Sequence, residues 1–294
     1  MFNKFLKYLF YLTLFSIILG PVAALPLGIL QVNIYFTDIV VGLISLIWII
    51  RLKGTIKLIR SDKIASYFCI FVAVAMISLI FSPINLNINE KLISSLYIIR
   101  LFSYFFVYLT VRYLTDSSTI GGVHSDTPEV FLRLLTFAGV ILAVIGWLGY
   151  FLYPDLRNLY YLGWDPHYKR IFSSFFDPNY FGLMMVFTLI MLFTWKESLR
   201  NTFQVAGWTP GRWILAIFIF ISLMFTYSRS SYMALMGALI TYSLFKKKYI
   251  LIAGALIILI LSAILLPRPS GEGVKLERVF SIEQRIENWK QGAQ

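Results

Sequence analysis

The chain of 294 residues has little of what most soluble enzymes use, since it contains one cysteine, two histidines and 14 acidic residues. The single cysteine, Cys69, excludes a disulfide within the chain. No cluster of side chains has the spacing of metal ligands, and neither a glycine-rich phosphate loop nor a Ser/His/Asp arrangement is visible. We therefore expect no bound metal and no cofactor.

Charged residues are also scarce, at 14% of the chain, whereas 59% of residues are apolar and the mean hydropathy is +0.78. A soluble domain of this size could not cover so much apolar surface. The apolar runs have about the length of a bilayer's hydrocarbon core, roughly 17–25 residues. The sequence therefore predicts an all-α, polytopic transmembrane bundle with about nine spans, over residues 5–24, 34–50, 64–82, 92–115, 130–153, 180–195, 213–226, 231–245 and 249–267.

The orientation of the spans follows from the basic residues between them. Lys4 and Lys7 precede the first apolar run, which is too long for a signal peptide and lacks a clear cleavage site, so we interpret it as an uncleaved helix. Basic clusters such as Lys246–Lys248 are typical of cytoplasmic links. When these links are placed in the cytoplasm, the alternation of the spans puts the N-terminus there too. A net charge of +12 is also typical of proteins that bind nucleic acid or anionic lipid, but the charges lie mostly between spans. We expect a multi-pass inner (plasma) membrane protein that binds membrane lipids and no nucleic acid.

Some basic residues fall on the outer, periplasmic or extracellular side, where insertion disfavours them. They concentrate in residues 154–179, 227–231 and 267–294. Substrate binding is a reason to keep them there. Three arginines on one face predict a site for an anionic, lipid-linked substrate, most simply a diphosphate, and these are Arg170, Arg229 and Arg285.

Arg170 precedes a helix-start pattern in Arg-Ile-Phe-Ser-Ser-Phe-Phe-Asp-Pro-Asn. Asp177 is a good N-cap and Pro178 a good first helical residue, so a purely structural role explains both. Capping does not explain Arg170. Because a helix N-terminus attracts anions, Arg170 and the start of this helix could bind one phosphate together, with Asn179 in support.

Arg229 stands in a tight turn between two apolar runs, in Thr-Tyr-Ser-Arg-Ser-Ser. A guanidinium there needs water, a partner or an anion. One interpretation is an arginine that reaches lipid headgroups, with Ser228 and Ser230 capping the turn. The other is that Arg229 binds phosphate, with Ser228 in support.

Arg285 lies next to an apolar stripe formed by Ile282, Ile286 and Trp289 at helical spacing. The stripe predicts an amphipathic helix on the membrane surface, from which Arg285 could still point into a site.

Arg100 lies inside the fourth predicted span and needs a partner, for which Asp38 is a candidate. We expect this pair to be structural rather than catalytic. His167 lies in the outer loop, and a lone loop histidine is more often not a base.

The Arg170…Asp177-Pro178-Asn179 pattern, the helix–Tyr-Ser-Arg-Ser–helix hairpin around Arg229, and the later Gln284-Arg285…Trp289 pattern resemble the O-antigen ligase-related family. Each motif alone is weak, but their order and spacing are specific. The resemblance covers residues 165–294, and the first half agrees mainly in its span pattern. It divides the chain into N-terminal helices at 1–153 and a ligase-like region at 154–294.

The resemblance implies a metal-independent, GT-C-like membrane glycosyltransferase of the O-antigen ligase or O-antigen polymerase type, acting in lipopolysaccharide or other surface polysaccharide biosynthesis. Such an enzyme transfers a glycan from undecaprenyl diphosphate to an acceptor glycan or the lipid A core, at the outer face of the inner membrane. Arg170 and Arg229 would contact the diphosphate and Arg285 would lie near it, with Asp177, Asn179, Ser228 and Arg100 in support.

The chain departs from the family at its end, because nothing after Trp289 can supply the histidine that the family uses as a base. The catalytic residue is therefore unknown, and we expect a truncated chain that is inactive alone.

Two other classes of function remain open. A transporter or a lipid or polysaccharide flippase would suit an intramembrane Arg100, and it predicts broken helices with charge at the midplane. A purely structural partner in a polysaccharide-assembly complex is the third. The gathering of charge at the outer face favours the enzyme.

Overall fold

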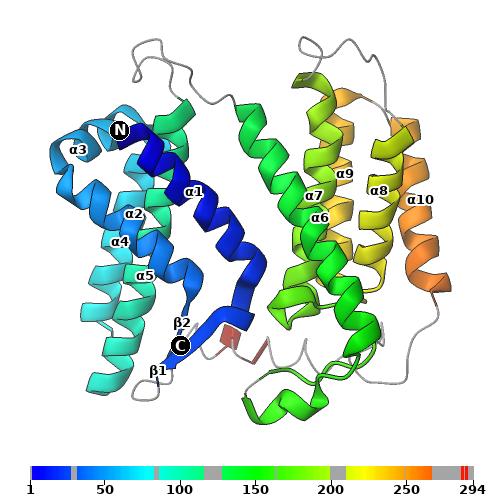
Figure 1. The fold of residues 1–294 in the computed structure, drawn as a ribbon, viewed down its shortest axis with the longest axis horizontal. Coiled ribbons are helices and arrows are strands. Elements are labelled where there is room, and N and C mark those ends of the chain that lie inside the picture. Colours follow the sequence, from blue (N-terminus) through cyan, green and yellow to red (C-terminus); the bar gives the residue numbers. More distant parts are fainter. Residues whose placement is uncertain are drawn as a thin grey trace. The chain divides into compact units, whose positions relative to one another are not determined.

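The structure is a computed structural model, and the regular elements among the residues it describes are helices apart from one short hairpin (Figure 1). The structure describes residues 2–27, 32–82, 86–115, 128–162, 164–198, 210–247, 249–266, 286–287 and 289–290. The predicted all-α class is thus confirmed for these residues. They divide into two units, Met1–Leu134 (unit 1) and Leu135–Gln294 (unit 2), with the division inside one helix, α6 (Pro128–Leu152).

Several helices indicate a membrane protein. Within the described residues, 4 helices are long and apolar enough to cross a bilayer, over Lys4–Ala23, Lys63–Ile80, Ile88–Thr115 and Val130–Leu152. A bent pair, Phe36–Ile50 with Leu52–Ser61, would raise the number to 5. The predicted segments 180–195, 213–226 and 249–267 contain shorter apolar helices, and 231–245 lies in a more polar helix. About nine spans therefore remain a prediction.

Unit 1 is built around α5 (Ile88–Thr115), which contacts α1 (Phe2–Leu19), α2 (Phe36–Ile50) and α4 (Lys63–Ile80). Trp48 of α2 donates from Nε1 to Thr110 Oγ1 of α5 at 2.9 Å, which satisfies both polar groups in the interior. The core cluster is apolar and aromatic, and it consists of Leu6, Leu9, Ile44, Trp48, Ala65, Phe105, Phe106 and Leu109.

Two parts of unit 1 differ from the prediction. The α-helix of the first predicted span ends at Leu19, because Gly20 adopts a φ of 53° and Pro21 cannot continue an α-helix, but the apolar helical segment itself continues to Ala23, close to the predicted limit. After the short 3-10 turn η1 (Gly20–Ala23), the chain forms an antiparallel hairpin of β1 (Ala24–Leu27) and β2 (Val32–Tyr35).

The second difference is α3 (Leu52–Ser61), which occupies part of a predicted basic link. Its apolar residues Leu52, Ile56 and Ile59 repeat at helical spacing. The basic residues between them obscured this pattern in the sequence.

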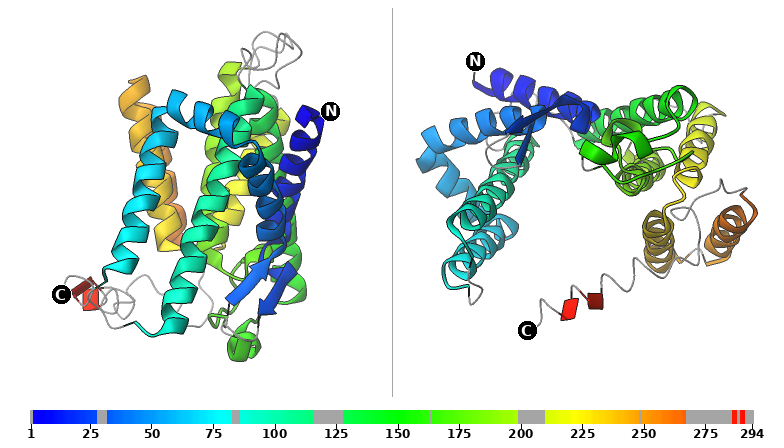
Figure 2. Two further views of the ribbon diagram at one scale, coloured as in Figure 1. Left: turned by 90° about the vertical axis from the view of Figure 1, so that its left-hand side faces the viewer. Right: turned by 90° about the horizontal axis from the view of Figure 1, so that it is seen from below.

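Unit 2 is a bundle of most of α6 with α7 (Pro178–Ser198), α8 (Pro210–Met224), α9 (Arg229–Lys246) and α10 (Tyr249–Leu265), as Figures 1 and 2 show. Helix α7 contacts both α8 and α9, and α9 contacts α10. Trp147 Nε1 of α6 donates to Ser222 Oγ of α8 at 2.9 Å. The loop after α6, the start of α7 and the α8–α9 turn all lie at one end of this unit (Figure 1).

Candidate anion-binding site

The start of α7 is capped as the sequence predicts. The helix begins at Pro178, and the Asp177 carboxylate accepts a hydrogen bond from Asn179 N at 2.7 Å. The carbonyl of Asp177 accepts the bond from Phe181 N at 3.0 Å that closes the first turn. Capping by Asp177 and Pro178 is therefore confirmed, and the N-terminus of α7 is fixed in place.

The turn between α8 and α9 is held by hydroxyl groups. Thr226 donates from Oγ1 to Leu223 O at 2.6 Å and accepts from Ser228 N at 3.2 Å. Ser228 is the N-cap of α9, since its Oγ accepts from Ser231 N at 3.3 Å. Ser230 Oγ lies 3.0 Å from Ser228 Oγ. The turn thus presents Arg229 as the first residue of α9.

The two helix N-termini meet through Asn179. Ser228 Oγ donates to Asn179 Oδ1 at 2.9 Å, and Ser231 Oγ lies 3.2 Å from Asn179 O. Gly182, one turn into α7, allows this approach, because a Cβ at that position would lie 2.8 Å from Ser231 Cβ. The positive ends of two helix dipoles therefore point to the same region.

Arg170 links the loop between α6 and α7 to the same turn. Its side chain is buried, and Nε donates to Thr226 O at 2.8 Å. The neighbouring backbone does likewise, since Ile171 N donates to Phe225 O at 3.0 Å. Arg170 therefore lies against the carbonyl three residues before Arg229. This contact joins two motifs that are 56 residues apart in the sequence.

His167 is the residue whose place the sequence did not predict. It is 6% exposed, and its Nδ1 lies 3.3 Å from Nη1 of Arg170. Because a guanidinium is always a donor, Nδ1 must be the acceptor, and the neutral imidazole then carries its proton on Nε2. The only sequence signal was the spacing of three residues from Arg170.

The loop between α6 and α7 is closed at its base by backbone hydrogen bonds. Leu156 N donates to His167 O and Lys169 N donates to Pro154 O, both at 2.8 Å. Asp155 forms an exposed ion pair with Arg157, with Nη2 and Oδ2 2.6 Å apart. The side-chain hydrogen bond from Arg157 lowers the pKa of Asp155 to about 2. The two backbone hydrogen bonds, rather than this exposed pair, fix the positions of His167 and Arg170.

Backbone strain concentrates around the site. Among described non-glycine residues, Lys169, Ser173, Phe176 and Tyr227 have φ between 48° and 56°, and only Lys247 elsewhere shares this conformation. Bulky residues such as phenylalanine and tyrosine adopt it at a cost, so the surrounding contacts must hold them. Such strain is common where a binding site needs a particular shape.

The predicted site residues fall into three groups. Arg170, Asp177, Asn179, Ser228 and Arg229 come together at one end of unit 2. Arg285 lies outside the described residues. The surface helix predicted around it also includes residues outside them. No metal-binding group of three or more His, Cys, Asp or Glu occurs in the described part of the chain.

Arg100 belongs to unit 1, where the predicted pair with Asp38 is present, with Nη2 and Oδ2 2.7 Å apart. The same Nη2 donates to Asn33 O, and Tyr104 OH donates to Asp38 Oδ1. The pair borders an otherwise mostly apolar pocket of about 320 Å³. These contacts account for Arg100 structurally.

Ser228→Ala is expected to destabilise the protein by about 1–2 kcal/mol, because it removes both the α9 cap and the bond to Asn179. Ser230→Ala is the matched control, since Ser230 is exposed, and its effect should stay within about 0.5 kcal/mol. Thermal unfolding of the purified protein in detergent measures both. Equal losses for the two variants would contradict the bridging role of Ser228.

Comparisons of the chain with protein-family models, with curated proteins and with solved structures find no match. The inference of function therefore depends on this chain's own residues and their geometry.

Proposed function

We propose that the protein is a membrane glycosyltransferase of the O-antigen ligase or polymerase type, which takes its glycan from a polyprenyl-diphosphate donor. The observation that carries this proposal is the meeting of two helix N-termini with Arg170 and Arg229 at one end of unit 2. Such a group of donors and positive charges is suited to an anion with several oxygens.

The chemistry requires this kind of site. An acceptor hydroxyl attacks the anomeric carbon, its proton passes to a base, and the bond from that carbon to the diphosphate oxygen breaks. Negative charge then develops on the leaving lipid diphosphate. Fixed guanidinium groups and helix N-termini stabilise that charge without having to reorganise. The base remains unassigned, since Nδ1 of His167 faces Arg170.

The two arginines take different parts in this proposal. Arg170 holds the turn through Thr226 O and contributes its buried positive charge. Arg229 begins α9 beside the Ser228–Asn179 bridge, from where its planar fork can bind two phosphate oxygens. Helices α7 and α9, with 21 and 18 residues, would reach about 30 Å at 1.5 Å per residue, close to a bilayer's hydrocarbon thickness. We therefore also propose that unit 2 spans the membrane as part of a GT-C-like bundle of about nine spans, with the site at the outer face.

Binding of short donor analogues tests the proposal. Farnesyl diphosphate should bind the detergent-purified protein on the order of 10- to 100-fold more tightly than farnesyl monophosphate, because it makes at least one more charge-assisted hydrogen bond. Chelation of divalent cations should not change this ratio. Isothermal titration calorimetry measures each affinity, with farnesol as the control for the apolar chain. Equal affinity for the diphosphate and farnesol would refute the site.

A further inference from the structure

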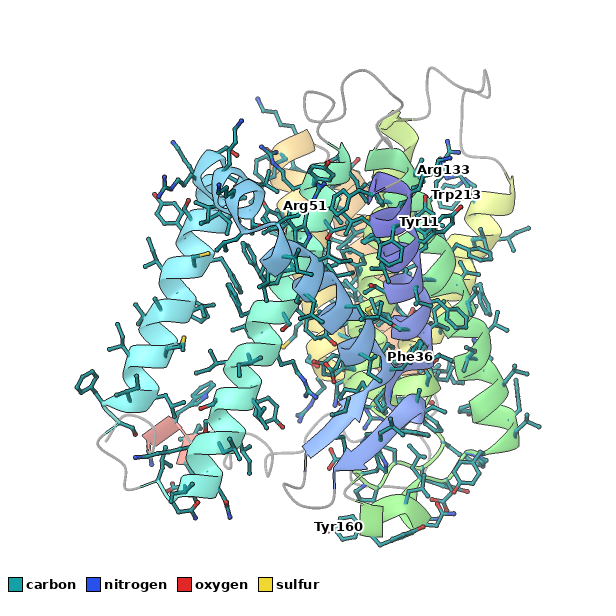
Figure 3. All side chains as sticks on the ribbon, turned by 60° about the vertical axis from the view of Figure 1, so that its left-hand side comes forward. Tyr11, Phe36, Arg51, Arg133, Tyr160 and Trp213 are labelled. Carbon is teal, nitrogen blue, oxygen red and sulfur yellow. The ribbon has the colours of Figure 1, made fainter. Side chains whose placement is uncertain are left out.

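Helix α3 joins the apolar helices α2 and α4 and lies at about a right angle to α2. Helix α2 ends at Ile50, α4 begins at Lys63, and α3 is bent by 95° from α2. Arg51 forms the corner between α2 and α3 (Figure 3), and Figure 2 shows α3 crossing near the ends of α2 and α4. Helix α4 is long and apolar enough to cross a bilayer, and α3 stands directly before its first residue, so α3 is placed at the level of the membrane surface.

The faces of α3 differ in their environment. Thr55 is buried and donates to Trp48 O at 2.6 Å, and Leu58 and Ile59 pack against the unit 1 core cluster. On the exposed side, three basic residues recur at i, i+4 and i+7, so they form one stripe. We name this the α3 basic stripe, and it consists of Lys53, Lys57 and Arg60, all exposed.

Apolar side chains border the basic stripe. Leu52 and Ile56 are 57% and 40% exposed although both are large and apolar. Each lies one residue before a lysine of the stripe, so the apolar row runs beside the basic row. An exposed apolar row next to cationic side chains is the pattern of a helix that rests at a lipid–water interface.

No described acidic residue neutralises the α3 basic stripe. Residues 51–63 contain five basic residues and one acidic residue, Asp62. Asp62 is buried and turned inward, where its carboxylate caps α4 and accepts from Tyr108 OH at 2.6 Å. Arg112 lies 3.3 Å from it, and the hydrogen bond from Tyr108 lowers the pKa of Asp62. The charge of Lys53, Lys57 and Arg60 therefore remains for an external anion.

We propose that α3 is an interfacial lipid-binding helix, on which Lys53, Lys57 and Arg60 bind the phosphates of anionic phospholipids while Leu52 and Ile56 enter the acyl region. This site is independent of the proposed glycan transfer. It fits phospholipids better than free phosphate because the charged row and the apolar row lie side by side. Each basic residue near an anionic surface contributes roughly tenfold or less to binding.

Native mass spectrometry of the whole chain in detergent tests the proposal with three probes, dioleoyl phosphatidylglycerol, dioleoyl phosphatidylcholine and inorganic phosphate. The stripe variant is K53Q/K57Q/R60Q. Its control is K91Q/R157Q/K169Q, which removes the same charge from exposed residues elsewhere. The wild-type protein should bind phosphatidylglycerol in preference to phosphatidylcholine. The stripe variant should bind phosphatidylglycerol on the order of 10- to 100-fold more weakly than the wild-type protein. The affinity of the control for this lipid should fall by less than about threefold.

Two further outcomes separate the possible ligands. The double variant L52S/I56S should weaken phosphatidylglycerol binding and leave phosphate binding unchanged. Wild-type lipid affinity in the stripe variant, or an equal loss in the control, would overturn the proposal. Displacement of the lipid by millimolar inorganic phosphate would overturn it as well, since the stripe would then be a simple phosphate site. Thermal unfolding of each variant checks that the fold is intact.

Discussion

Arg229→Ala is expected to reduce glycan transfer by the protein by about 30- to 1000-fold, which corresponds to about 2–4 kcal/mol in the transition state. The loss follows from removing one charge-assisted contact where negative charge develops on the diphosphate. Arg229→Lys should recover little of this rate, because lysine keeps the charge but lacks the planar fork for two phosphate oxygens. The assay is transfer from the lipid-linked donor at matched expression.

The matched control for Arg229 is Arg157→Ala. Arg157 lies in the same loop as Arg170, but its guanidinium is exposed and pairs with Asp155, so transfer should stay within about twofold of wild type. Unfolding temperatures of both variants separate a loss of chemistry from a loss of fold. If well-folded Arg229→Ala protein transferred glycan at the wild-type rate, Arg229 would be an interfacial anchor and not a ligand of the diphosphate.

Gly182→Ala is expected to destabilise the protein by about 1–3 kcal/mol through overpacking. The added methyl group would meet Ser231 and separate the N-termini of α7 and α9. The sign of this stability change is informative, because helix propensity alone would make Gly182→Ala stabilising by up to about 1 kcal/mol. Glycan transfer should fall as well, since the two helix N-termini would no longer converge.

Gly237→Ala provides the opposite expectation within α9. Apart from its chain neighbours and the nearby backbone of α9 itself, no described atom lies within 4 Å of a Cβ built at Gly237, so only the helix propensity changes, and stability should rise or stay the same. Urea or thermal unfolding in detergent compares the two variants. If Gly182→Ala left the free energy of unfolding unchanged or raised it, the close contact between α7 and α9 at Ser231 would be contradicted.

Local signals in the sequence predicted much of the fold. Apolar runs marked the positions of most helices, because burial and membrane insertion act on every residue of a run. The cap at Asp177 and the turn at Ser228 were predictable since capping involves residues only two or three apart. The Arg100–Asp38 pair followed from the cost of an unpaired charge inside a span.

Contacts between distant segments were not predictable in this way. The bond from Arg170 to Thr226 O uses a backbone carbonyl, which leaves no trace in residue type. The place of His167 depends on the loop closure at Pro154 and Lys169, again through backbone groups. Helix α3 was missed because its basic residues indicated a link, although the same residues lie on one face of a helix.

The most direct test of the central claim is an experimental structure of the protein with farnesyl diphosphate bound. The account predicts the diphosphate at the joint N-termini of α7 and α9, with oxygens within about 3 Å of the Arg229 guanidinium and with Arg170 beside it. A diphosphate bound elsewhere would contradict the claim. So would guanidinium groups of Arg170 and Arg229 separated by more than about two helix diameters, roughly 20 Å.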